Sequence, residues 1–121
     1  MPLSAINLDT GKPVAEKVEK ATTWRARAKG LLGRTHLREG DALLIAPCRQ
    51  IHTFFMKFSI DVLFLDRHHR VLGVHHRLVP FRMSPYYHRA WGVLELAAGE
   101  LEKSATEKGH RLKFQEEAPT S

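Results

Sequence analysis

The chain has 121 residues, 19 Lys and Arg against 13 Asp and Glu, and a formal net charge of +6. A chain of this length makes one domain, and a hydrophobic fraction of 43% with 26% charged residues fills one modest core. This composition excludes intrinsic disorder, collagen-like repeats and a small protein held together by disulfides. We therefore expect a single domain over residues 1–114 and a disordered tail over residues 115–121.

The cellular compartment is inferred from cysteine usage and from apolar runs. The single cysteine, Cys48, excludes an intrachain disulfide and a zinc cage of several cysteines. The opening residues contain no apolar run of signal-peptide length. The longest unbroken apolar stretch, residues 42–47, is far shorter than the roughly 20 residues that cross a bilayer. We expect a cytoplasmic protein without a transmembrane segment.

Short apolar runs rich in β-branched and aromatic residues alternate with polar or proline-containing breaks, a pattern typical of strands. In chain order, the expected strands are residues 3–6, 14–20, 42–46, 51–58, 60–65, 70–78, 91–97 and 110–114. A four-residue connection at 66–69 suits a hairpin, and a short helical turn is expected within residues 98–108.

One helix is predicted after the second strand. Thr22 or Thr23 can cap its start, and Gly33 ends it. The apolar residues that recur at helical spacing are Trp24, Ala28, Leu31 and Leu32. Because basic residues occupy the other side, we expect the apolar stripe to face the core.

The order of these elements decides the fold class. Most adjacent strands have no helix between them, which excludes a parallel sheet built from βαβ units. We expect a mainly β fold, either an antiparallel β-sandwich or a partly closed barrel, with one packed α-helix. An open α+β sheet with the helix on one face is the alternative.

Basic residues gather in two stretches that contain no acid. Residues 20–38 hold six Lys or Arg, and residues 67–94 hold five Arg together with five of the eight His. Segregation of this kind suits an anionic partner such as nucleic acid or a phosphorylated metabolite. Single basic side chains along strands and a helix also form ordinary solvated faces, which is the commoner outcome.

The loop of residues 80–91 interleaves aromatic rings with guanidinium groups. Rings that stack and groups that donate hydrogen bonds are used to hold both single-stranded nucleic acid and sugars. The ligand face that we expect consists of Arg82, Tyr86, Tyr87, His88, Arg89 and Trp91. In the structural alternative, Phe81, Tyr86 and Trp91 only cover an open end of the core.

Cys48 and His52 lie four residues apart, and Asp61 would be brought alongside them by the next strand. A thiol, an imidazole and a carboxylate together suit a metal site or a nucleophilic triad. We favour the structural interpretation, in which the thiol and the imidazole belong to the core. The three remain the candidate catalytic residues, and no metal and no cofactor are expected.

Asp61 lies in a run that is apolar on both faces of a strand, so its carboxylate needs a partner. The candidates are Arg34, Lys57 and His52, or else several backbone N–H groups. We favour a structural ion pair between Asp61 and Arg34, which would hold the turn at residues 30–34 against the sheet.

Three segments in a fixed order carry a family resemblance: GLLGR at residues 30–34, APCRQIHTFFMKFSIDVLFLD at 46–66 and VLELAAG at 93–99. Together they resemble the domain-of-unknown-function family numbered 192, over residues 14–114. The resemblance implies a compact, mainly β fold and brings no established reaction or catalytic residue. Leu32 stands where many members have Met, and the export leader of many members has no counterpart in the opening residues.

We expect a small β-rich binding or accessory domain rather than an enzyme. Its ligand face would be the loop of residues 80–91, and its partner an anionic small molecule or a carbohydrate. One alternative is a metal- or thiol-dependent enzyme centred on Cys48, His52 and Asp61. The other is a basic RNA-binding protein, with nucleic acid the less favoured partner.

Overall fold

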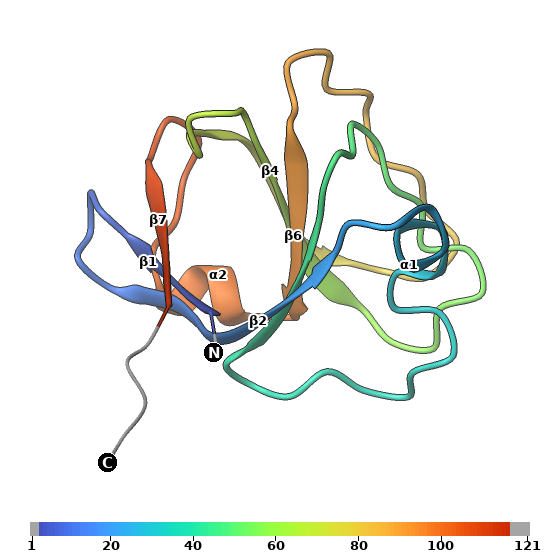
Figure 1. Cartoon of the computed structure of the whole chain (residues 1–121). Coiled ribbons are helices and arrows are strands. Elements are labelled where there is room, and N and C mark those ends of the chain that lie inside the picture. The colour runs from blue at the N-terminus through green and yellow to red at the C-terminus, as the bar shows by residue number, and fades with distance from the viewer. Residues whose placement is uncertain (1–2, 117–121) are drawn as a thin grey trace.

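The computed structural model describes residues 3–116, which form one seven-stranded sheet and two short helices (Figure 1). The elements are β1 (Leu3–Asn7), β2 (Pro13–Ala21), α1 (Trp24–Lys29), β3 (Asp41–Ile45), β4 (Ile60–Leu65), β5 (Val71–Leu78), β6 (Gly92–Ala97), α2 (Glu100–Lys103) and β7 (Leu112–Glu116). The strands lie in the order β5-β4-β6-β3-β2-β1-β7. No helix within residues 3–116 has the length and apolar character that crossing a membrane requires.

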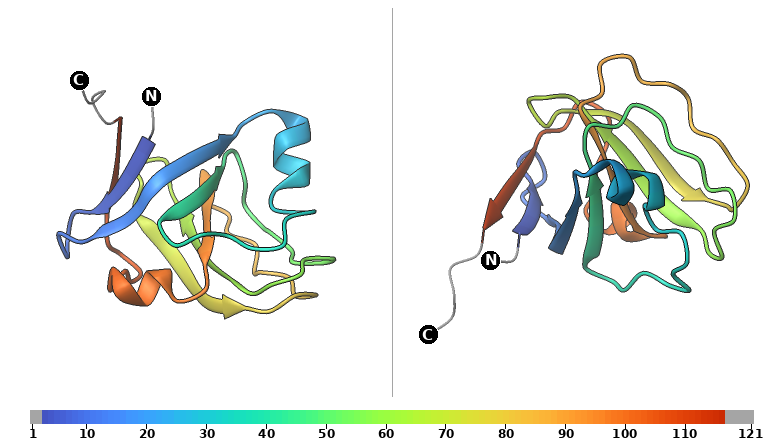
Figure 2. Two further views of the ribbon diagram at one scale, coloured as in Figure 1. Left: turned by 90° about the horizontal axis from the view of Figure 1, so that it is seen from below. Right: turned by 45° about the vertical axis from the view of Figure 1, so that its right-hand side comes forward.

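The sheet is mixed rather than purely antiparallel. All neighbouring strands are antiparallel except β2 and β3, which are parallel. The segment between β2 and β3 contains α1 and is long enough to return the chain to the same end of the sheet, as a parallel connection requires. Figure 2 shows the sheet curling on itself, with α1 at the end away from β1 and β7.

The barrel is closed at one end by the two edge strands of the sheet. β7 pairs with β1, and the start of β7 also reaches the start of β5. The backbone N–H of Val71 donates to the carbonyl of His110 at 2.8 Å, and that of Leu112 donates to His69 at 2.9 Å. The expected mainly β, partly closed barrel with a packed helix is therefore confirmed.

Buried side chains form two clusters, one on each face of the sheet. Leu63 and Leu94 belong to the first cluster, and their strand neighbours Phe64 and Val93 belong to the second. All six residues of β4 are buried, because both of its faces are covered. The second face is covered by Leu31, by Ile51 and Met56 from the loop before β4, and by Ala90 from the loop before β6, which brings these loops next to the sheet.

The helix prediction is right about its start and wrong about its apolar stripe. Thr23 caps α1, and its side-chain oxygen accepts a hydrogen bond from the N–H of Ala26. The helix ends at Lys29 and not at the expected Gly33, and Gly30 follows with φ 49°. Trp24 is 74% exposed, whereas Leu31 is buried from a position beyond the helix end.

The strand expected at residues 51–58 is wrong. This segment is irregular, and Phe55 has a positive φ of 65°. Thr53 is fully buried, and its hydroxyl donates to the carbonyl of Val79 at 2.7 Å and accepts from the N–H of Arg82 at 2.9 Å. The buried hydroxyl is thus satisfied by the backbone of a distant loop, and no neighbouring strand of the sheet pairs with this segment.

The other expected strands and the hairpin are confirmed, with bounds that differ by one or two residues. The short helical turn expected within residues 98–108 corresponds to α2. The first two residues of the expected tail, Gln115 and Glu116, belong to β7 instead, because they pair with β1. Residues 117–121 lie outside the described part of the chain.

Candidate functional site

The loop of residues 80–91 is joined by backbone hydrogen bonds to the segment around Cys48. The N–H of Tyr87 donates to the carbonyl of Arg49 at 2.8 Å, and the N–H of Cys48 donates to the carbonyl of Trp91 at 3.1 Å. The backbone N–H of Trp91 in turn donates to the carbonyl of Leu65, the last residue of β4, at 2.7 Å. Three segments that are distant in the sequence are therefore fastened together at one end of the sheet.

These three segments surround a depression of about 550 Å³, which we call the arginine depression. Its polar lining is mostly basic, and the half-buried Trp91 also lines it. The basic residues are Arg49, Arg67, His68, His88 and Arg89. Asp66 also lines it, but one of its carboxylate oxygens accepts hydrogen bonds from the N–H groups of His68 and Arg70 in the hairpin. Within residues 3–116, no ion pair joins the three arginines to a carboxylate.

The predicted ligand face is only partly assembled there. His88, Arg89 and Trp91 line the arginine depression, whereas Arg82 and Tyr86 are exposed outside it. The role that the structural alternative gave to aromatic residues of this loop, that of covering the core, is filled by Tyr87.

Tyr87 packs into the molecule. Its ring stacks on Phe64 with 4.2 Å between ring centroids, and its hydroxyl contacts His75 Nε2 at 2.8 Å. Gly73 leaves room for this ring, because a Cβ atom at position 73 would overlap it. Burial raises the pKa of the Tyr87 hydroxyl and lowers the pKa of His75.

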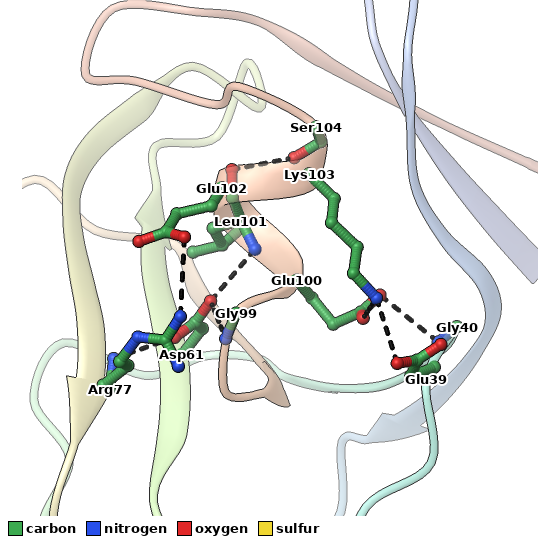
Figure 3. Close-up of polar contacts among 10 residues, drawn as sticks. All are labelled: Glu39, Gly40, Asp61, Arg77, Gly99, Glu100, Leu101, Glu102, Lys103 and Ser104. Carbon is green, nitrogen blue, oxygen red and sulfur yellow. Dashed lines mark hydrogen bonds and ion pairs between the residues drawn. The ribbon is translucent and has the colours of Figure 1, made fainter.

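Asp61 is fully buried, and its partners are three backbone N–H groups (Figure 3). One carboxylate oxygen accepts from Arg77 at 2.8 Å, and the other accepts from Gly99 and Leu101 at 3.0 Å each. The expected ion pair between Asp61 and Arg34 is wrong, because Arg34 pairs with Glu19 at 2.8 Å. Of the partners considered from the sequence, the backbone N–H groups are the ones found.

Cys48, His52 and Asp61 do not form a catalytic triad. The Cys48 thiol donates to the carbonyl of Gln50 at 3.3 Å, and burial raises its pKa, which disfavours the reactive thiolate. The expectation that His52 belongs to the core is wrong, because His52 is exposed and stacks on Phe54. Asp61 has its hydrogen bonds at the other end of β4, next to α2, and does not contact either residue.

Cys48 and His52 do share a cavity of about 150 Å³, which we call the Glu95 cavity. Its lining comes from three parts of the chain: residues 27–32, residues 45–56 and Glu95 on β6. Glu95 is only 4% exposed, and burial raises its pKa to about 7, against the opposing effect of the Arg34 charge.

Glu95 was not among the expected site residues, although the sequence contains a signal for it. Glu95 lies in the run VLELA, which is apolar on both faces of a strand, as is the run around Asp61. The same argument therefore applies to both acids, since an ionised carboxylate is costly to bury without a partner.

The curled sheet defines a small, single-domain, β-rich protein. The arginine depression and the Glu95 cavity are open on it. The chain belongs to the family DUF192, described as "Uncharacterized ACR", whose model matches residues 5–114, so the expected resemblance is confirmed. No curated protein matches the chain.

Two crystal structures share this fold. One, of a protein of unknown function from Novosphingobium aromaticivorans, has 21% identity and a TM-score of 0.79, covering 93% of this chain and 84% of that one. The other, described as a putative transcription regulator from Sinorhizobium meliloti, has 22% identity and a TM-score of 0.78, covering 93% of this chain and 91% of that one. The family and both structures support the fold and assign no reaction.

Proposed function

We propose that this protein is a binding protein that holds a small anionic ligand in the arginine depression. One observation carries this proposal. Arg49, Arg67 and Arg89 come from three separate segments, surround one depression and have no carboxylate partner within residues 3–116. Guanidinium groups that converge without acids attract phosphate and carboxylate groups, which they bind through paired hydrogen bonds.

The shape and the rigidity of the depression support the same proposal. Its volume of about 550 Å³ is that of a small-molecule site. The backbone bonds between Cys48, Trp91 and Leu65 hold the three segments together, so little ordering is needed on binding. The half-buried Trp91 offers an apolar surface beside the charges, which suits a ligand with a flat or apolar part.

The proposal is tested by isothermal titration calorimetry with pyrophosphate, citrate and a nucleoside monophosphate as probes. We expect at least one anion to bind, and the double variant Arg67→Ala with Arg89→Ala to weaken it by about tenfold or more, because two charge-assisted contacts are lost. Arg25→Ala is the matched control, since Arg25 is exposed on α1 and does not line the depression.

Four outcomes would contradict the proposal. In the first, none of the anions binds. In the second, an anion binds to the double variant as well as to the unaltered protein. In the third, only RNA binds, with an affinity that falls steeply with salt and that Arg25→Ala reduces as much as the double variant does. A neutral saccharide that binds the double variant and the unaltered protein alike would also place the ligand face elsewhere.

A further inference from the structure

Glu95 is a buried acid set among apolar neighbours. On β6 it alternates with Leu94 and Leu96, so it lies on the same face of the sheet as Val93. Its strand partners are Leu43 on β3 and Val62 on β4, both buried. The carboxylate therefore leaves the sheet between two aliphatic side chains.

Glu95 has no hydrogen bond and no ion pair with any described residue. Asp61, on the neighbouring strand, is buried as deeply and accepts three backbone N–H bonds. Glu95 instead lines the Glu95 cavity, together with Gly30. A Cβ atom at Gly30 would lie 3.6 Å from Glu95 Oε1. An acid that is buried without a partner at a cavity wall is typical of a ligand site.

The remainder of the lining combines positive charge with apolar surface. Arg27 and Lys29 line the cavity from α1, and Lys29 is exposed to solvent. Arg27 donates from Nη1 to the carbonyl of Pro47 at 3.0 Å, and its buried Nε has no hydrogen-bond partner. The apolar part of the lining includes Leu31, Ile51 and Met56.

We propose that the Glu95 cavity binds a small α-amino acid as a zwitterion. The ammonium group of the ligand would donate to Glu95, and its carboxylate would face Arg27 and Lys29. A short aliphatic side chain would pack against Leu31, Ile51 and Met56. This site is separate from the arginine depression, because the two share no lining residue.

The charges select this class of ligand. A simple amine would satisfy Glu95 but would leave Arg27 opposed by a second positive charge. A simple carboxylic acid would satisfy Arg27 but would place its own negative charge near Glu95. The size fits as well, since a cavity of about 150 Å³ accommodates a molecule of benzene size in another protein.

The first test uses the unaltered protein and a set of three related probes. L-valine carries both charged groups, isovalerate lacks the ammonium group, and isobutylamine lacks the carboxylate. Binding is followed by the amide shifts of residues 27–32 and 48–56 in ¹H–¹⁵N NMR spectra. We expect L-valine, or a smaller amino acid such as L-alanine, to bind at least about tenfold more tightly than either analogue, because each analogue loses one charged contact.

The second test uses Glu95→Gln, which keeps the shape of the side chain and removes its charge. We expect this variant to bind the amino acid at least about tenfold more weakly. Glu102→Gln is the matched control, because Glu102 is an exposed acid on α2 and lies outside the cavity. Circular dichroism establishes whether Glu95→Gln is folded, and the analogue series decides the question on the unaltered protein if it is not.

The results that overturn the proposal are distinct from those that overturn the anion site. The amino-acid site is refuted if none of the twenty standard amino acids shifts these amides, if isovalerate or isobutylamine binds as tightly as L-valine, or if a folded Glu95→Gln variant binds unchanged. The variant lacking Arg67 and Arg89 should retain amino-acid binding, so either site can fail alone.

Discussion

The carboxylate of Asp61 accepts a hydrogen bond from the backbone N–H of Leu101 at 3.0 Å and so fastens the first turn of α2 to β4 (Figure 3). The N–H groups of Gly99 and Arg77 complete the set, so one buried side chain joins three parts of the chain. A four-residue helix has little stability of its own. Its position therefore depends on this anchor and on the burial of Leu101.

We predict that Asp61→Asn lowers the free energy of unfolding by about 3 kcal/mol, because an amide NH₂ replaces an acceptor and leaves buried N–H groups without a partner. Urea denaturation followed by circular dichroism measures this change. Asp41→Asn is the control, since Asp41 is half-buried at the start of β3 and its side chain makes no hydrogen bond to any described residue. Equal effects of the two variants would contradict the role given to Asp61.

Glu95 makes stability depend on pH in a predictable direction. Its pKa is raised to about 7 in the folded protein, from an ordinary value of 4.5, so the folded state holds a proton that the unfolded state has already released between these pH values. Stability contributed by this proton is fully present below about pH 4.5 and is lost as the pH rises through about 7. The expected loss from this group is about 3 kcal/mol.

Urea denaturation at a series of pH values measures this dependence. Glu95→Gln should flatten the curve between pH 4.5 and 7, because the titrating group is gone. Glu102→Gln, at an exposed site, should leave the slope unchanged. A slope that survives in the Glu95→Gln variant would mean that Glu95 is not the group responsible.

The contribution of Tyr87 to stability can be compared with that of its sequence neighbour, Tyr86. Removing its hydroxyl in Tyr87→Phe breaks the contact with His75 and should cost about 1 kcal/mol of stability. Tyr87→Ala also removes the ring that stacks on Phe64 and should cost about 3 kcal/mol or more. Thermal denaturation compares these with Tyr86→Phe and Tyr86→Ala. Tyr86 is 59% exposed, so its variants should change stability little, and a larger effect at Tyr86 would contradict the packing.

Cys48 should react slowly with iodoacetamide at neutral pH. Burial raises the pKa of its thiol, so the thiolate that carries out the attack is scarcer at neutral pH than for an exposed cysteine. Mass spectrometry of the alkylated protein measures the rate, with free glutathione as the reference. A Cys48 that reacts faster than glutathione at pH 7 would restore the thiol-dependent alternative.

Local patterns were sufficient for most of the fold. The strand of β4 was expected within its observed bounds because its apolar run is unbroken, and the hairpin after it follows from four polar residues between two such runs. A cap at Thr22 or Thr23 was predicted, and Thr23 is the cap observed, because capping involves residues only three apart. The mainly β class, as a sandwich or a partly closed barrel, followed from the absence of helices between most strands.

The sites depended on contacts that no local pattern contains. The burial of Asp61 was predictable, but its partners lie 16 to 40 residues away, and a cation was expected where the fold supplies backbone N–H groups. The depression around Arg49, Arg67 and Arg89 exists only because three loops meet at the end of the sheet.

The amino-acid sequence by itself determined where most strands form, where α1 begins and that Asp61 is buried, because propensity, periodicity and capping act over a few residues. Only the tertiary structure decided that β2 and β3 run parallel, that residues 51–58 stay out of the sheet and that Glu95 faces a cavity. These outcomes depend on which distant backbone groups and side chains meet, and a buried polar group takes whichever partner the fold brings to it.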